Sequence, residues 1–208
     1  MDEFVLTLVV RVEKSARPGQ TDALETAARA VLAILADERS AGEGEWAEAM
    51  RAWQDARIRK VVRRARGAEW RRAEALPGIT VTGSAAEVRV FPPVPLDAVP
   101  KDLAKLQVTG TDFEDPAELP SVAADEPVLW INPGLTMSSG KAMAQCGHAA
   151  HLAWLALSAA GRKEWVAADF ALGGGSATPP PRNEPLTNGL PVVQDDRFPP
   201  VAPSPRHV

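Results

Sequence analysis

The sequence predicts an α/β fold in which one unit occurs twice. Runs rich in β-branched residues alternate along the chain with longer segments whose apolar residues have helical spacing. A strand followed by such a helix is expected near the N-terminus and again after residue 127. The apolar segments 31–35 and 152–157, which end the two helices, are also alike. We interpret these parallels as a duplication, with chance similarity as the alternative.

Residues 1–112 contain the elements expected of the first unit. A continuous apolar run at 5–12, rich in β-branched residues, favours a strand that is largely buried. Either Thr21 or Asp22 can cap a helix that reaches residue 35. The other expected elements are a helix at 45–53, a strand at 58–64, a helix at 68–76, strands at 79–81 and 87–91, and a short helix from residue 99.

A segment rich in proline and acidic residues predicts a linker at 113–127, followed by a second domain at 128–208. In this second domain a strand at 128–131 precedes a loop. Ser138 or Ser139 is a candidate cap for a helix that reaches about residue 157. Three glycines at 173–175 and three prolines at 179–181 are not expected in a regular helix or a central strand. We expect the chain after residue 173 to be poorly ordered.

The composition of the chain excludes several classes of protein. A formal net charge of -4 argues against a polycation that coats nucleic acid. The lone Cys146 excludes an intramolecular disulfide and a Cys-x-x-Cys metal site. The acidic residues after Met1 do not resemble a secretory signal, and no apolar run has the length of a membrane span. We therefore expect a cytoplasmic protein that does not associate with membranes.

One helix carries the strongest indication of chemistry. Helical spacing places Lys141, Gln145 and His148 in one polar stripe on an otherwise apolar helix. The lysine lies in the first turn, beside backbone N–H groups that could hold a phosphate or a carbonyl oxygen. The alternatives are a solvated lysine, a surface glutamine and a histidine that packs between helices. His148 and His151 lack a third metal ligand nearby, and Cys146 lies on the apolar side, as a core residue would.

The glycines at 134 and 140, followed by Lys141, are close to a phosphate-binding P-loop. However, five residues instead of four separate the two glycines, and Ala142 stands where a serine or threonine would bind magnesium. Nucleotide hydrolysis is therefore not supported.

The segment 137–149, Met-Ser-Ser-Gly-Lys-Ala-Met-Ala-Gln-Cys-Gly-His-Ala, resembles the signature near the start of type-II peptidyl-tRNA hydrolases. Residues 193–203 resemble a later motif of that family more weakly. The resemblance covers 128–208 and, as a degenerate copy, 4–108. It implies a small mixed sheet with helices on both faces, a three-layer α/β/α fold that is often dimeric. The duplicated half could supply the partner from within as a pseudo-dimer, and a homodimer is the alternative.

The same resemblance implies that the protein hydrolyses the ester between a peptide and the terminal ribose of tRNA, without a metal or an organic cofactor. Lys141 would stabilise the oxyanion, Gln145 would orient water or the peptide, and Asp195 would act as a base or as the partner of Lys141. Arg197 and Pro199 stand where the family has glycine and threonine. A non-catalytic relative that binds tRNA or protein is thus an alternative, as is an unrelated α/β domain.

Basic residues are concentrated between positions 57 and 72, where eight of them accompany one acid, Glu69. Such a run can follow the phosphates of an RNA backbone. Ordinary solvated arginines on a strand and a helix are the alternative. The candidate tRNA-binding residues are Arg57, Arg59, Lys60, Arg63 and Arg64.

Overall fold

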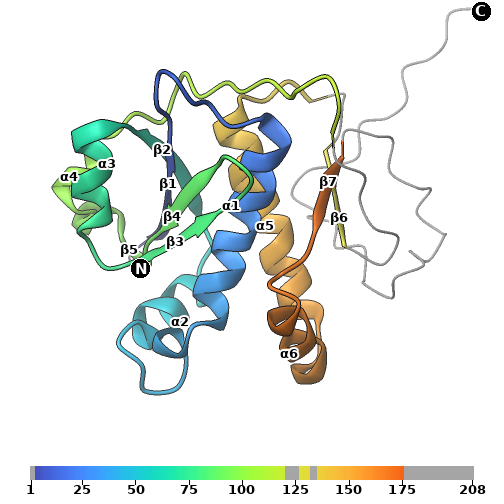
Figure 1. Ribbon diagram of the computed structural model, residues 1–208. Coiled ribbons are helices and arrows are strands. Elements are labelled where there is room, and N and C mark those ends of the chain that lie inside the picture. Colours follow the sequence, from blue (N-terminus) through green and yellow to red (C-terminus); the bar gives the residue numbers. More distant parts are fainter. Residues whose placement is uncertain (1–2, 120–126, 132–134, 176–208) are drawn as a thin grey trace, which may run out of the picture.

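A computed structural model describes residues 3–119, 127–131 and 135–175 of the chain (Figure 1). Its main sheet is mixed, and β1 (Phe4–Arg11) is the central strand. On one side β1 pairs in parallel with β2 (Lys60–Ala65). On the other side it pairs with the antiparallel strand β4 (Glu87–Val90), which in turn pairs with β3 (Ile79–Thr82). The two-residue β5 (Val94–Pro95) extends the pairing at the start of β1.

The apolar run of β1 supplies both faces of the sheet. Leu8 and Val10 belong to the core beneath α1 (Gln20–Ala36) and α2 (Ala47–Asp55). Val9 belongs to a second cluster, with α3 (Gly67–Glu74) and α4 (Lys101–Ala104). Successive residues of a strand point to opposite faces, so an uninterrupted apolar strand fits only between two layers of helices. The α/β class and its three layers are confirmed.

The predicted cap of α1 is wrong. Gly19 precedes the helix, without a side-chain hydrogen bond to its first turn. The carboxylate of Asp22 instead accepts hydrogen bonds from the backbone N–H groups of Ser84, Ala85 and Ala86, at 2.8, 2.7 and 2.7 Å. Asp22 lies three positions after the N-cap Gly19, inside the first turn of the helix, and its side chain holds the turn between β3 and β4. These contacts fasten the β3–β4 hairpin to α1.

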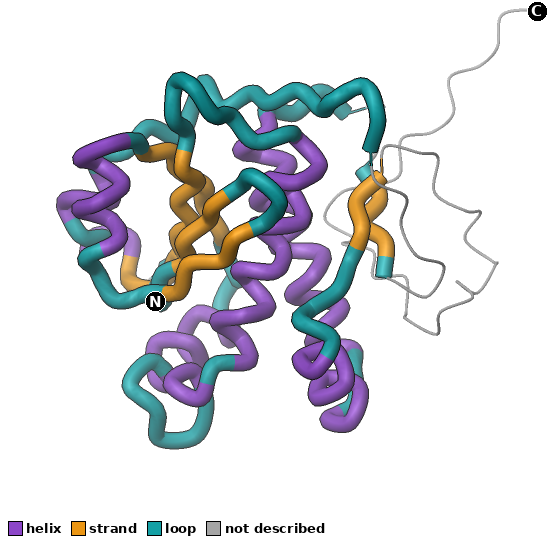
Figure 2. The backbone as a smooth tube through the Cα atoms, in the orientation of Figure 1, coloured by secondary structure: helices purple, strands orange, loops and turns teal. Residues whose placement is uncertain are grey.

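The described part of the second half repeats the order of strand, two α-helices and strand with which the first half begins. After β6 (Val128–Trp130) come α5 (Ser139–Ala156), α6 (Ala159–Ala167) and β7 (Gly173–Gly175) (Figure 2). β7 pairs in parallel with β6, as β2 does with β1. The three glycines therefore form a short strand, so the poor order expected after residue 173 is wrong for residues 174 and 175. Among the described residues β7 has a single partner strand, and such an edge position tolerates glycine better than the centre of a sheet does.

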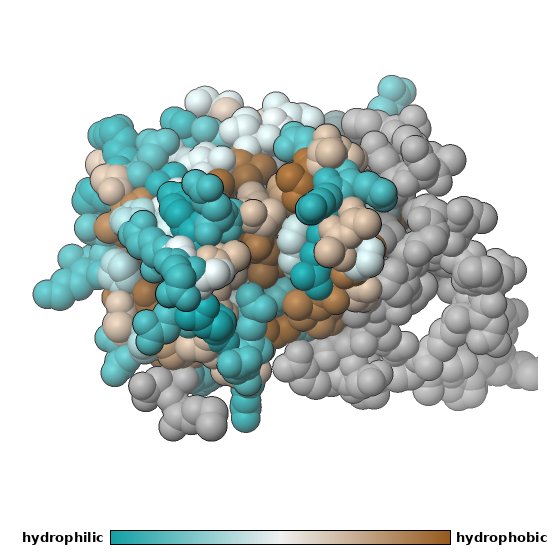
Figure 3. Space-filling model, turned by 90° about the horizontal axis from the view of Figure 1, so that it is seen from below, coloured by the Kyte–Doolittle hydropathy of each residue, from teal (hydrophilic) through white to brown (hydrophobic). Residues whose placement is uncertain are grey.

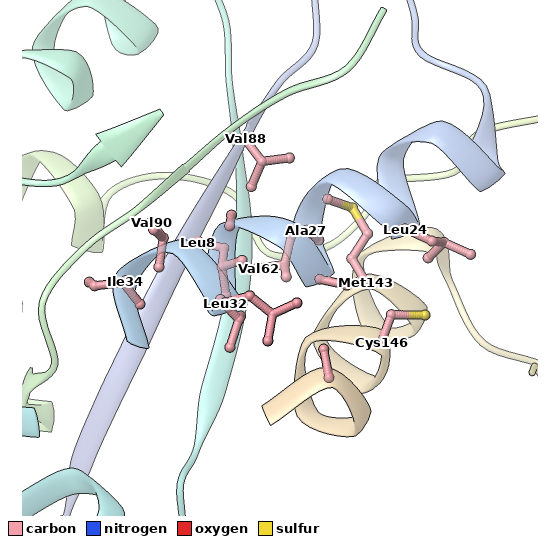
Figure 4. Close-up of a cluster of buried hydrophobic side chains, with 14 of the residues drawn as sticks. Leu8, Leu24, Ala27, Leu32, Ile34, Val62, Val88, Val90, Met143 and Cys146 are labelled. Carbon is pink, nitrogen blue, oxygen red and sulfur yellow. The ribbon is translucent and has the colours of Figure 1, made fainter. Parts of the chain in front are cut away.

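The helices of the two halves share one hydrophobic core. α5 packs against α1, and the two helices run in the same direction (Figure 1). Gly147 lies in this contact, where an added Cβ would be 2.9 Å from Cγ2 of Val31. Met143 and Cys146 belong to the same cluster as Leu24 and other residues of α1 (Figure 4). From the end of the molecule where α2 and α6 lie, hydrophobic residues are gathered near the middle of the face (Figure 3).

The start of the predicted linker is packed against both helices. Phe113 is 6% exposed and lies in the shared core, and its backbone N–H donates to Oγ of Ser139 at 2.8 Å. The remaining described elements are the short helices η1 (Glu38–Ser40) and η2 (Leu96–Ala98). Among the described residues, no helix is long and apolar enough to cross a membrane. The region after residue 175, for which poor order is expected, lies outside the described residues.

Candidate active site and basic surface

The first turn of α5 carries the candidate catalytic lysine. Ser138 caps the helix, because its Oγ accepts a hydrogen bond from the backbone N–H of Lys141 at 3.5 Å. Ser138 was one of the two predicted caps. Ser139, the other, is buried and donates from Oγ to Oε1 of Gln20 at 3.2 Å. This contact holds the start of α5 beside the start of α1.

The polar stripe of α5 faces outward. Lys141 and Gln145 are exposed and His148 is half-buried, whereas Met143 and Cys146 on the inner side are buried. The spacing of four residues places the lysine and the glutamine about one turn apart on the same side of the helix. The lysine is thus combined with the partial positive charge of a helix N-terminus. Together they can hold an anion or the negative charge that develops on a carbonyl oxygen.

Asp195, the third candidate catalytic residue, lies outside the described residues. Its role as a base or as the partner of Lys141 stays a prediction. Cys146 is described, and the interpretation as a core residue is confirmed. It is 5% exposed, and burial raises the pKa of its thiol to about 12. The thiol therefore stays protonated at neutral pH and is no nucleophile there.

The predicted basic surface is divided by contacts within the protein. Arg57 and Arg59 are exposed, and Nη1 of Arg59 lies 2.9 Å from a carboxylate oxygen of Glu3. Arg63 is half-buried, and its Nη1 donates to the carbonyl oxygens of Ala104 and Leu106 at 3.2 and 2.9 Å. Burial also lowers the pKa of the Arg63 guanidinium. Arg63 consequently ties β2 to the end of α4 and to the segment that follows it.

Arg64 connects the basic strand to the start of α5. Its guanidinium donates to the side chain of Gln107 and lies beside Gly110, where an added Cβ would be 3.5 Å from Nη2. The same segment meets α5, because the N–H of Gly140 donates to the carbonyl oxygen of Thr111 at 3.4 Å. Of the candidate tRNA-binding residues on β2, Arg64 is therefore the one whose neighbouring segment also contacts the helix start that carries Lys141.

Lys60 points inward, toward a cluster that the sequence did not indicate. Its Nζ lies 3.3 Å from Nδ1 of His151 and 4.7 Å from the ring centroid of Trp53. The imidazole of His151 is fully buried and stacks on Trp53, with 4.9 Å between the ring centroids. Burial, with the charge of Lys60 as a smaller cause, lowers the pKa of His151 to about 3. The neutral imidazole can then accept a hydrogen bond from Lys60 at Nδ1.

One signal in the sequence could have identified His151 as a core residue. It follows Met143 and Gly147 at intervals of four, which places all three on the side of α5 that faces the core. Its partners, however, come from α2 and β2 and could not be named from the sequence.

The described residues therefore combine Lys141 and Gln145 on the exposed side of α5 and leave two of the five basic residues, Arg57 and Arg59, on the surface. They contain no cluster of His, Cys, Asp or Glu that could hold a metal ion. Comparison with known proteins finds no family model, no curated protein and no solved structure that matches this chain.

Proposed function

We propose that this protein hydrolyses the ester that joins a peptide to the terminal ribose of tRNA, and that it does so in the cytoplasm. The observation that carries the proposal is the exposed Lys141 in the first turn of α5, with Gln145 one turn further along the same exposed side. The resemblance of residues 137–149 to type-II peptidyl-tRNA hydrolases supports the choice of ester.

The chemistry follows from the charges that develop during hydrolysis. Water attacks the ester carbonyl, negative charge grows on the carbonyl oxygen, and the bond to the ribose oxygen then breaks. An ammonium group that is already in position stabilises this oxyanion. The Gln145 amide has a donor and an acceptor, so it can orient the water or the peptide. Asp195 is the proposed acceptor of the water proton, and it passes this proton to the ribose oxygen as the ester bond breaks.

The basic residues support RNA as the carrier of the ester. Arg57 and Arg59 offer exposed cations, and Arg64 lies beside the segment that contacts the start of α5. Contacts between such cations and phosphates release counterions, so the affinity for tRNA should fall as the salt concentration rises. Binding that is independent of salt would argue against this surface.

The test is peptide release from a purified peptidyl-tRNA by the wild-type protein and by Lys141→Ala. We expect the variant to lose on the order of 10²- to 10³-fold in kcat/KM, the loss typical of removing one oxyanion donor. Its affinity for tRNA should change little, because a single charge is removed. Lys163→Ala, at an exposed position of α6, is the matched control and should behave like the wild type. Equal release by Lys141→Ala would contradict the proposal.

The second candidate is a non-catalytic relative that binds tRNA or protein and keeps only the fold. The observation in its favour is the pair Arg197 and Pro199, at the positions where the hydrolase family has glycine and threonine. Wild-type protein that binds peptidyl-tRNA in a salt-dependent manner without releasing peptide would select this alternative.

A further inference from the structure

One tetrapeptide occurs twice in the sequence. Residues 91–94 and 198–201 both read Phe-Pro-Pro-Val. The first tetrapeptide follows β2, which ends at Ala65, and the second follows β7, which ends at Gly175. The numbers of residues between strand and tetrapeptide are similar in the two halves. Since β2 and β7 are corresponding strands of the two halves, the tetrapeptide occupies corresponding places.

In the first half this segment covers the side of β1 that faces away from β2. The N–H of Phe91 donates to the carbonyl oxygen of Thr7 at 3.0 Å. Val94 then lies opposite Val5 in the antiparallel pairing of β5 with β1. The side chain of Phe91 is 4% exposed, in the cluster with α3 and α4. Prolines lack a backbone donor and suit such a strand at the margin of a sheet.

In the second half the corresponding edge is open within the described residues. β6 pairs there with β7 and with no other strand. Trp130 of β6 is 38% exposed, and Val128 and Leu129 are half-buried. Backbone N–H and C=O groups that have no strand partner among the described residues, beside apolar side chains, form a surface on which another strand can be added.

We propose that residues 198–202 of the same chain dock antiparallel on this open edge of β6, as residues 91–95 dock on β1. The dipeptide Val-Leu occurs near the start of both strands, at Val5 in β1 and at Val128 in β6, and sets the register. Val201 then lies opposite Val128, and the N–H of Phe198 donates to the carbonyl oxygen of Trp130. The 22 residues between Gly175 and Phe198 can span roughly 70 Å when extended, which is ample for the return.

This docking stands independently of the proposed hydrolase activity, but it has a consequence for it. Asp195 precedes Phe198 by three residues, as Val88 precedes Phe91. Val88 lies opposite Val10, close to the end of β1 that leads to α1. The matching position for Asp195 is the end of β6 that leads to α5. The docked segment therefore brings this carboxylate toward the helix start that carries Lys141.

The test is disulfide formation in the full-length chain carrying Val128→Cys and Val201→Cys, with Cys146→Ala to remove the native thiol. Opposite residues of an antiparallel pair have Cα atoms about 5.5 Å apart or closer, which a disulfide spans. We expect this pair to close within one chain at least about ten times faster than Val128→Cys with Val208→Cys, because docking raises the effective concentration only in register. Val5→Cys with Val94→Cys, also with Cys146→Ala, is the positive control.

Equal rates for the two Val128→Cys pairs would overturn the proposal, as would a disulfide that forms mainly between two chains, which assigns the edge to a second copy. Hydrogen exchange of the unmodified protein provides a second measurement if a variant does not fold. The N–H groups of Phe198 and Val201 should exchange at least about ten times more slowly than those of residues 183–189. Both measurements are independent of peptide release. A negative result would therefore contradict the docking without contradicting the proposed hydrolase activity, which the release assay tests.

Discussion

The starts of α1 and α5 lie side by side, but different groups accept hydrogen bonds from the backbone N–H groups of their first turns. In α1 the carboxylate of Asp115 accepts from the backbone N–H and from Oγ1 of Thr21, at 2.7 and 2.8 Å. In α5 the hydroxyl of Ser138 accepts from the backbone N–H of Lys141, whose side chain is exposed. An acid at a helix start stabilises the helix, whereas a lysine there costs about 0.3 to 1 kcal/mol. The start of α1 thus favours stability, and the start of α5 retains a cation that stability does not explain.

The strands that precede the two helices differ in burial. All residues of β1 from Val5 to Val10 are buried, whereas Trp130 of β6 is exposed. The first half holds most of the sheet, and the second half adds two helices to the shared core with a small sheet beside them. Under the proposed function, the first half provides the scaffold and the second half provides the chemistry.

The largest expected effect comes from exchanging the residues at the two helix starts. Lys141→Gln should lower kcat/KM for peptide release on the order of 10²- to 10³-fold. Adding Gln20→Lys should not restore activity, because Asp115 already neutralises the start of α1. Release assays on the single and double variants check this expectation. Recovery in the double variant would show that the two helix starts are equivalent.

The contact between the halves can be broken at Gly147. A leucine there must displace Val31, since even a Cβ would lie 2.9 Å from its Cγ2 in a fully buried contact. Gly147→Leu should lower the free energy of unfolding by about 3 kcal/mol, at the upper end for an overpacked core. Urea unfolding measures the change, with Ala156→Leu at an exposed position of α5 as the matched control. An unchanged midpoint would mean that the helices do not share this interface.

Asp22 marks a difference between corresponding helix positions. It lies three residues after the N-cap Gly19, whereas Lys141 lies three residues after the N-cap Ser138 and is exposed. Asp22→Ala leaves three backbone donors of the β3–β4 turn without their acceptor and should cost about 2 kcal/mol of stability. Asp22→Asn keeps one acceptor oxygen and should cost less. Thermal unfolding compares both variants with the control Asp97→Ala, at an exposed position. If all three variants were equally stable, the Asp22 carboxylate would not stabilise the fold through the β3–β4 turn.

The smallest effect concerns pH and His151. The unfolded histidine has a pKa near 6.5, whereas in the folded protein the pKa is lowered to about 3. Between these values the unfolded chain binds a proton that the folded chain does not, so stability falls as the pH falls through 6.5. From pH 7 to 5.5 the loss should be about 1 kcal/mol.

His151→Phe keeps an aromatic ring on Trp53 and should remove that loss. Urea unfolding at the two pH values gives the loss of stability of the wild type and of the variant. The difference between the two losses is the contribution of His151, separate from that of the other histidines. If the wild type and the variant lose the same stability on acidification, His151 is not the group responsible.

Local patterns predicted much of the fold. The strand β1, the helices α1 and α5, the Ser138 cap and the burial of Cys146 all follow from periodicity and from residue preferences within a few positions. Contacts between distant residues were beyond such reasoning. Asp22 meets a turn 62 residues away and Lys60 meets a histidine 91 residues away, and neither pairing leaves a local signal. The strand at 173–175 was missed because its pairing with β6 outweighs the weak strand preference of glycine.

Part of the candidate site could also be predicted from local patterns. The outward positions of Lys141 and Gln145 follow from helical spacing alone. The inward position of Lys60 depends on Trp53 and on α5, so its assignment to an exposed basic surface could not anticipate the cluster with His151.

The most direct test of hydrolysis at the start of α5 is a single-turnover experiment with the protein in excess over a peptidyl-tRNA that carries a labelled peptide. We expect complete release by the wild type, at a rate at least about 100-fold above that of an equally folded Lys141→Ala variant. Labelled peptide that stays esterified with the wild type, at the rate seen without protein, would contradict the proposed function.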